Sequence, residues 1–382
     1  MNKSKVAIVR CKGYEDELVY NSIKRGIDLL GGVLNFAKPG EKMVLKPNVL
    51  VGADPAKAVT THPIIFKAVG RIFKEAGTRV YFGDSPSFGG CESNMRRAGL
   101  MQVADDMGFV LADFDHGKEV SHNSALLNKR FVLANGILES DGVISLPKMK
   151  THGLTRFTGA VKNQFGCIPG ILKGQFHVKM SNPYDFATML VDINTFIHPR
   201  LYIIDGIIAM EGNGPRNGKP RAMNVLLFSA DPIAVDSIAC KIIDLNPEFV
   251  PTSKPGEKAS LGTYHYENID VIGDDIESFI VKDFDVVKKP PIPTTDGTVR
   301  TFLKNQLTPR PVINTTKCTG CGTCIKICPV GATALDWMHH EAGKPPKHVY
   351  KNCIRCFCCQ ETCPEGAITI KSPILGKVIF RG

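Results

Sequence analysis

The chain has 382 residues, of which 43% are hydrophobic and 22% charged, and its formal net charge is +10. That length suits two or three domains, and that apolar content excludes a chain that is disordered throughout. No stretch approaches ~18 uncharged apolar residues and the N-terminus has no secretory core, so we expect a cytoplasmic protein without a membrane span, whose 13 cysteines are reduced.

Short apolar runs alternate with amphipathic stretches over the first 286 residues. The runs predict strands at residues 6–9, 43–45, 80–82, 109–111, 142–146, 201–204 and 225–228. Helices are predicted to begin at Pro63, Pro183 and Pro232, because proline is favoured at the first helical position. This alternation predicts one α/β domain with a large, mostly parallel sheet over residues 1–286. Such sheets bind ligands beyond the carboxyl ends of their strands.

Polar and charged residues gather in four stretches that follow those strands. The stretches are residues 46–48, residues 83–86, residues 147–153 with the following 159–170, and residues 205–216. Lysines can form a cationic pocket there, and glycines let backbone approach a ligand, so we predict a site for a carboxylate, phosphate or acyl oxyanion. The residues predicted to be catalytic are Lys150, His152, Lys162 and Asp84. Those predicted to bind the ligand are Lys46, Asn48, Lys148, Asn163, Asp205 and Glu211. The alternative is a solvated basic edge with turn glycines.

A proline-rich stretch, residues 288–297, separates this domain from the cysteines. Proline lacks a backbone donor and fixes φ, so the stretch predicts a semi-rigid linker. We expect the linker and a short helix at 299–307 to occupy residues 287–309, a small α+β domain residues 310–372, and a tail residues 373–382.

Nine of the cysteines lie between Cys318 and Cys363, where one spacing occurs twice. Residues 318–329 and 353–364 both read C-x2-C-x2-C-x3-C-P. Three thiolates of one loop can bind three irons of a cubane, and two such loops complete two 4Fe–4S clusters by exchanging their last cysteine. The first cluster is therefore assigned to Cys318, Cys321, Cys324 and Cys363. The second cluster is assigned to Cys353, Cys356, Cys359 and Cys328.

The alternative is a pair of structural zinc sites, but zinc gives no reason for a third closely spaced cysteine and a Cys-Pro. Cys358 stands beside a predicted ligand and is interpreted as a bystander, with ligand exchange as the other possibility. The two halves are separated by residues 333–352, an insertion around Trp337 that a minimal ferredoxin does not need.

Residues 310–371 hold eight basic residues (Lys or Arg) and four acidic residues (Asp or Glu). Two oxidised clusters of about −2 each offset this excess, which argues against a nucleic-acid surface. Residues 212–219 look like a phosphate loop but have the wrong spacing, and no dinucleotide fingerprint follows a strand. Flavin sites have no obligatory motif, so a flavin stays open as a second cofactor that the sequence does not indicate.

Several of these motifs together resemble the domain-of-unknown-function family numbered 362. They are residues 46–48, 83–86, 147–152, 159–166, 205–206 and 231–236. The resemblance spans about residues 5–280, and the C-terminal part is similar to two-cluster bacterial ferredoxins. It implies an iron–sulfur protein of a type common in anaerobes, whose large domain is distantly similar to the N-terminal domain of nickel-pincer lactate racemases. The resemblance does not supply a reaction.

Three functions remain open from the sequence. In the first, an oxidoreductase passes electrons between the clusters and an anionic substrate in the α/β domain. In the second, the protein is an electron-transfer or maturation partner of another enzyme and has no substrate of its own. In the third, the clusters sense redox state or oxygen. The first two functions require an electron-donor or electron-acceptor protein.

Overall fold

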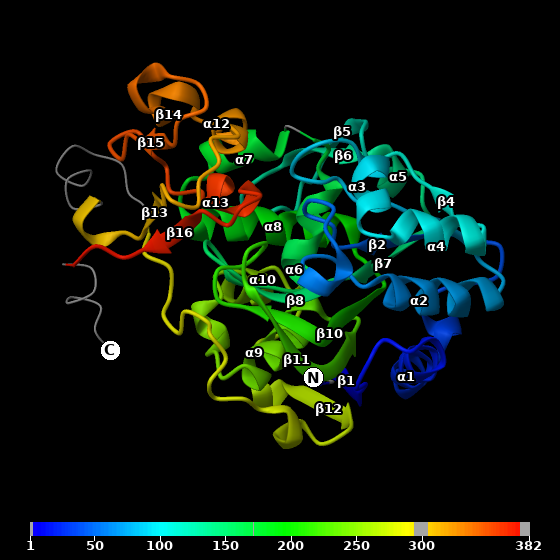
Figure 1. The fold of residues 1–382 in the computed structure, drawn as a ribbon. Coiled ribbons are helices and arrows are strands. Elements are labelled where there is room, and N and C mark those ends of the chain that lie inside the picture. Colours follow the sequence, from blue (N-terminus) through cyan, green and yellow to red (C-terminus); the bar gives the residue numbers. More distant parts are fainter. Residues whose placement is uncertain (1–2, 171, 294–304, 375–382) are drawn as a thin grey trace.

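The computed structural model describes residues 3–170, 172–293 and 305–374, and its centre is a ten-stranded sheet (Figure 1). Eight strands lie side by side in the order β12 (Ile269–Gly273), β1 (Ser4–Arg10), β11 (Lys219–Ser229), β10 (Leu201–Glu211), β7 (Gly142–Leu146), β2 (Lys42–Pro47), β3 (Arg79–Phe82) and β4 (Val110–Leu111). β8 (Lys148–His152) pairs with β10 and with β9 (Arg156–Thr158). Only β9 and β11 run antiparallel to their neighbours in this sheet, so the predicted α/β class is confirmed.

Helices cover both faces of the sheet (Figure 1). They are α1 (Asp16–Leu29), α2 (Pro63–Glu75), α3 (Cys91–Arg97), α4 (Leu100–Met107), α5 (Asn135–Leu138), α6 (Ala160–Asn163), α7 (Leu172–Lys179), α8 (Pro183–Ile197), α9 (Pro232–Ile242) and α10 (Ser253–Lys258). α2, α8 and α9 begin at their predicted prolines. The Asp231 carboxylate accepts the N–H groups of Ile233 and Ala234 at 2.8 Å, which satisfies two backbone donors at the start of α9.

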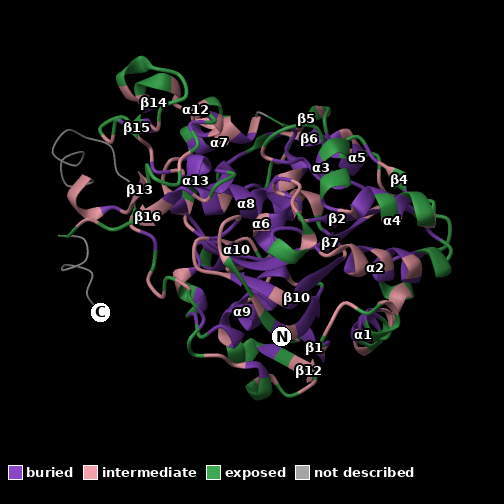
Figure 2. Ribbon diagram, viewed as in Figure 1, coloured by how far each residue is buried: buried purple, intermediate pink, exposed green. Residues whose placement is uncertain are grey.

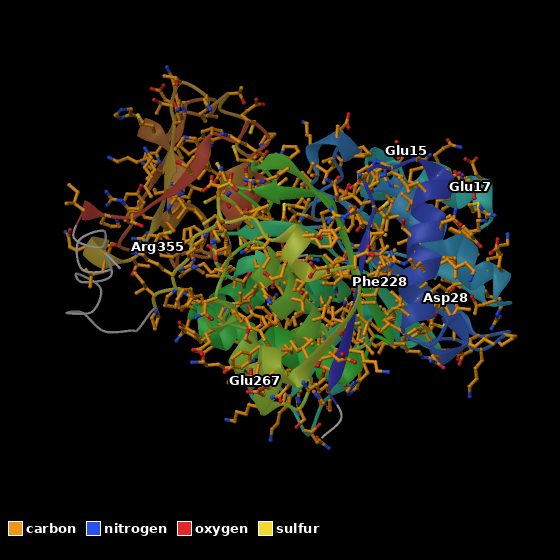
Figure 3. All side chains as sticks on the ribbon, turned by 90° about the horizontal axis from the view of Figure 1, so that it is seen from below. Glu15, Glu17, Asp28, Phe228, Glu267 and Arg355 are labelled. Atoms are coloured by element: carbon orange, nitrogen blue, oxygen red, sulfur yellow. The ribbon has the colours of Figure 1, made fainter. Side chains whose placement is uncertain are left out.

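The core has two sides because successive strand residues point to opposite faces of the sheet. On β1, Ala7 and Val9 join the cluster that contains α1, whereas Val6 and Ile8 join the cluster that contains α9. α1 lies close to β11 at Gly26, where a Cβ atom would be 2.3 Å from the Phe228 ring. Figure 3 shows Phe228 beside this helix.

The C-terminal unit contains two strand pairs and two short helices (Figure 1). β13 (Arg310–Ile313) pairs with β16 (Ile368–Lys371), and β14 (Leu335–Trp337) pairs with β15 (Pro346–His348). β14 and β15 lie in the insertion around Trp337. α12 (Thr323–Ile327) and α13 (Cys358–Thr362) occupy equivalent positions in the two cysteine repeats. All five residues of α13 are buried, and Figure 2 shows this helix at the boundary with the α/β domain.

Outside the large sheet, β5 (Gly117–Ser121) and β6 (Arg130–Ala134) form a separate antiparallel pair. Before the undescribed residues 294–304, the proline-rich stretch lies on the α/β domain, since the Tyr184 hydroxyl donates to the Pro291 carbonyl at 3.0 Å. The helix expected at 299–307 falls mostly outside the described residues, although 305–307 are helical. In the described part of the chain, no helix is long and apolar enough to cross a membrane.

Candidate functional site

Eight cysteines of the C-terminal unit line two small cavities, four at each. Cys318, Cys321, Cys324 and Cys363 line one, and Cys328, Cys353, Cys356 and Cys359 line the other. We call them the first and the second cysteine set. Each set takes three cysteines from one sequence repeat and one from the other, as the predicted exchange requires.

The chemistry of the two sets fits cubanes. Thiolates are the ligands that iron–sulfur clusters use, and a cubane holds its four sulfur ligands apart at its corners. A zinc ion instead draws its ligands to about 2.3 Å from one point. Among the described residues, no three His, Cys, Asp or Glu side chains stand close enough to bind a single ion. The Ala367 N–H also donates to the Cys363 sulfur at 3.3 Å, and such donors stabilise a ligand thiolate.

Both sets combine buried cysteines with more accessible ones. In the first set Cys321 is exposed but Cys324 and Cys363 are buried, whereas in the second set Cys359 is buried and the other three are half-buried. The His348 ring nitrogen Nε2 lies 3.5 Å from the Cys359 sulfur. Cys321 is therefore the one exposed cysteine among the eight.

A cavity of about 810 Å³ lies between the α/β domain and the C-terminal unit. We call it the junction cavity. Its α/β wall includes Asn48, Asp84, Lys162 and Asn163, and its other wall includes Cys328, Cys358 and Glu361. Cys328 belongs to the second set, and no cysteine of the first set lines this cavity. Of the two sets, only the second borders the junction cavity.

A network of buried hydrogen bonds holds the α/β wall in place. At the end of β2, the Lys46 ammonium group forms an ion pair with Asp84 at 2.6 Å and donates to Asn163 Oδ1 at 3.2 Å. Asp84 also accepts the N–H of Val49 at 2.8 Å. A Cβ atom at Gly166 would be 1.8 Å from Asp84 Oδ1, so only glycine fits there. Lys46 neutralises Asp84, and this part of the wall presents little net charge to the cavity.

Lys162 is the predicted catalytic residue that lines the cavity with an uncommitted charge. In the described structure, no hydrogen bond or ion pair joins its ammonium group to another residue, and the group lies 6.0 Å from the centre of the Phe165 ring. Burial lowers the pKa of Lys162, although the nearby Glu361 carboxylate favours its charged form. A cation that lacks a fixed partner in a partly desolvated cavity can bind an anion strongly.

Lys173, which no sequence motif indicated, supports the same cavity from α7. Its ammonium group donates to the Ser85 carbonyl at 3.1 Å, the Ser85 hydroxyl at 2.7 Å and the Ile168 carbonyl at 2.8 Å. All three of its donors are satisfied, so it fixes the loop after β3. Burial lowers the pKa of Lys173 to about 7.

This shifted pKa predicts a pH dependence of folding. Between pH ~7 and ~10.4 the unfolded chain keeps the Lys173 proton and the folded chain releases it, so the contribution of Lys173 to stability rises with pH. In Lys173→Met this rise is expected to disappear. The measurement is the free energy of unfolding of the parent protein and of Lys173→Met at about pH 6.5, 8 and 9.5. If this free energy changes with pH in the same way in both proteins, the prediction is wrong.

The structure turns three predicted residues away from the cavity. Lys148 forms an ion pair with Asp205 at 2.8 Å, and both side chains are at most 1% exposed. The Tyr14 hydroxyl donates to Asp205 at 2.9 Å and accepts from Lys148 at 2.9 Å. Lys150 donates to the Val59 carbonyl at 2.6 Å, and burial lowers its pKa well below its usual value. These groups are satisfied inside the protein, and none of them lines the junction cavity.

Glu211 and His152, which were also predicted at the site, do not line the junction cavity. Glu211, at the end of β10, pairs with Arg221 at 3.0 Å and accepts the Asp285 N–H at 3.1 Å, outside the junction cavity. His152 Nδ1 accepts the N–H of Leu154 at 3.0 Å, so the proton of the neutral ring is on Nε2. That atom lies 3.0 Å from Glu361 Oε1 on α13. Burial lowers the pKa of His152 to about 4, and the ring is neutral at neutral pH.

The loop that resembled a phosphate loop holds α13 against the α/β domain. Gln360 Nε2 donates to the carbonyls of Asn213 at 3.0 Å and Gly214 at 3.1 Å. Asn217 donates to the Cys363 carbonyl at 3.1 Å, and Arg216 donates to the Thr362 carbonyl. The sequence shows polar residues at this hairpin tip, but nothing in their spacing indicates a partner 140 residues away.

Arg355, between two cysteines of the second set, is 2% exposed and was not singled out either. Figure 3 shows it in the C-terminal unit. Its Nη2 donates to Asn305 at 2.6 Å, and its guanidinium group lies 5.0 Å from the centre of the Tyr350 ring. A buried cation at this position adds positive charge beside the second set.

Comparison with known proteins identifies two regions of the chain. The family model described as "Domain of unknown function (DUF362)" matches residues 43–241, and that of a 4Fe-4S dicluster domain matches residues 317–367. A thylakoid-associated protein of Synechocystis is 35% identical over 257 residues, covering 67% of this chain and 79% of that protein. An uncharacterized ferredoxin of Methanocaldococcus jannaschii is 38% identical over 60 residues, covering 16% of this chain and 75% of that protein.

Two solved structures are also similar. The lactate racemase apoprotein from Thermoanaerobacterium thermosaccharolyticum has a TM-score of 0.42 and 11% identity, and a Thermotoga maritima protein has a TM-score of 0.36 and 15% identity. The matches cover 63% and 60% of this chain, but only 56% and 59% of those structures. The two family models and the Synechocystis relative show that the chain belongs to the DUF362 family and carries a 4Fe–4S dicluster ferredoxin domain.

Proposed function

We propose that the protein binds two 4Fe–4S clusters and transfers electrons between them and an anionic ligand in the junction cavity. The observation that carries this proposal is the composition of the cavity, where Lys162 and a cysteine of the second set, Cys328, line the same space. An anion held at Lys162 would therefore lie beside the cluster that the second set binds. 4Fe–4S clusters accept and release single electrons at potentials set by their surroundings.

The exposed Cys321 and the position of the second set support an order for the electron path. Cys321 of the first set is exposed, which suits contact with an electron-donor or electron-acceptor protein. The second set borders the cavity and suits exchange with the ligand. The interlocked ligands keep both clusters within one small unit, since each loop supplies cysteines to both.

The α/β wall of the junction cavity suits the binding of an anion. Lys46, Asp84 and Asn163 fix the α/β wall by internal contacts, so that Lys162 is the cation of this wall that is available to the ligand. Lys162 binds the anion and stabilises negative charge that develops on it during reduction. α13 forms part of the cavity wall, and the attraction between Lys162 and the ligand is stronger in such partly desolvated surroundings than in water.

Metal content and reoxidation test the proposal together. Protein purified without oxygen is expected to contain about eight irons and no zinc, because two 4Fe–4S clusters account for all eight cysteines. After reduction with dithionite, one or more small organic anions should accelerate reoxidation. Zinc in place of iron would overturn the cluster assignment. Acceleration by a partner protein alone would favour the electron-transfer partner, and oxidation by oxygen alone would favour the sensor.

A further inference from the structure

The junction cavity is larger than a small inorganic anion requires. Its volume of about 810 Å³ lies within the range of roughly 300–1,000 Å³ in which proteins bind organic ligands of moderate size. Acetate or phosphate at Lys162 would leave most of this volume to water. The size of the cavity therefore points to a ligand with a substantial body in addition to its anionic group.

The residues that line the cavity indicate that the body of this ligand is apolar. Phe88, in the loop after β3, is 50% exposed, and Val178, on α7, is 47% exposed, and both line the cavity. Large apolar side chains at this exposure on two walls of one cavity form a surface that an apolar group can cover. Leu50 and Phe165 add further apolar surface to the lining.

The positive charges of the cavity complement an anionic group. Asp84 is paired with Lys46, the donors of Lys173 are used inside the protein, and Lys179 donates to Asn128. Lys162 and the exposed Lys326 remain as cations without a fixed partner among the described residues that line the cavity. We propose, building on the function above, that the ligand is an amphipathic organic acid. Its anionic group binds Lys162, and its apolar body of several carbon atoms covers Phe88 and Val178.

Calorimetric titration of the oxidised, iron-loaded protein without oxygen tests this inference. The probes are acetate, butyrate, hexanoate, inorganic phosphate and hexyl phosphate. Each buried methylene is expected to tighten binding about fourfold, so hexanoate should bind more tightly than butyrate and butyrate more tightly than acetate. Hexyl phosphate should likewise bind more tightly than inorganic phosphate, and its strength relative to hexanoate identifies the preferred anionic group.

Two variants of matched exposure locate the apolar contact. Val178→Asn should weaken hexanoate binding at least about fourfold and leave acetate unchanged. Val110→Asn, at a valine that is 48% exposed on β4 and outside the cavity, should change neither. If Val178→Asn slows electron exchange with a protein partner but leaves hexanoate binding unchanged, the patch is a docking surface and the inference fails.

The outcomes separate this inference from the proposed function. Small hydrophilic anions that bind at Lys162 with no gain from chain length would overturn the amphipathic ligand and leave the proposed function in place. Absence of binding by all five anions, together with no effect of any of them on reoxidation, would overturn both.

Discussion

Lys162→Met is expected to slow ligand-dependent reoxidation strongly at ligand concentrations that saturate the parent protein, and to leave the iron content unchanged. The substitution keeps most of the side-chain volume but removes a cation of the junction cavity that has no fixed partner among the described residues. A charge-assisted hydrogen bond contributes about 1.5–3 kcal/mol, so the affinity for the anion should fall by roughly ten- to a hundredfold. The measurements are iron per chain, ligand affinity and the reoxidation rate at several ligand concentrations.

Lys24→Met is the matched control for this variant. Lys24 lies on the exposed face of α1 in a pair with Asp28, and surface pairs of this kind contribute little. It should reproduce the parent protein in all three measurements. If Lys162→Met retains the parent's affinity and rate, the anion binds elsewhere, and the basic lining of the cavity is only a solvated edge.

Cys353→Ala and Cys318→Ala are expected to lose similar amounts of iron but to differ in function. Each removes one ligand of one set, so each variant should retain about four irons. Only the second set borders the junction cavity. With dithionite as reductant, Cys318→Ala should keep ligand-dependent reoxidation, whereas Cys353→Ala should lose it. Electron paramagnetic resonance of the reduced variants identifies the cluster that remains.

Cys358→Ala is the control for this pair, because Cys358 belongs to neither set although it lines the junction cavity. It should keep about eight irons and both spectroscopic signals. If Cys353→Ala keeps ligand-dependent reoxidation and Cys318→Ala loses it, the ligand does not exchange electrons with the second set, and the proposed electron path is wrong.

Local patterns were sufficient for much of the fold. The helices at Pro63, Pro183 and Pro232 begin where the sequence predicts because a proline and its preceding residue act within one turn. The predicted strands all occur, since a short apolar run is itself the signal of a buried strand. β8 was not expected, because its polar sequence becomes buried only through pairing with β10 and β9.

For the candidate site, local patterns were sufficient only in part. The sequence grouped Lys148, Lys150 and Lys162 as cations of one pocket. Burial of β8 instead commits Lys148 to Asp205 and Lys150 to the Val59 carbonyl, and these partners are distant in sequence. Lys162, on the short helix α6, remains at the cavity. Spacing alone cannot distinguish a lysine that finds an internal acceptor from one that does not.

By itself, the sequence determined the composition of the two cysteine sets, because each set follows from ligand spacing within two short repeats. It also determined the α/β class, which depends on local hydrophobic periodicity. The tertiary structure alone decided which set borders the junction cavity and which candidate residues line it. The first depends on how residues 212–218 hold α13, a contact that joins polar groups separated by more than a third of the chain. The second depends on the burial of β8, which commits Lys148 and Lys150 to internal partners. Such long-range pairing leaves no periodic signal in the sequence.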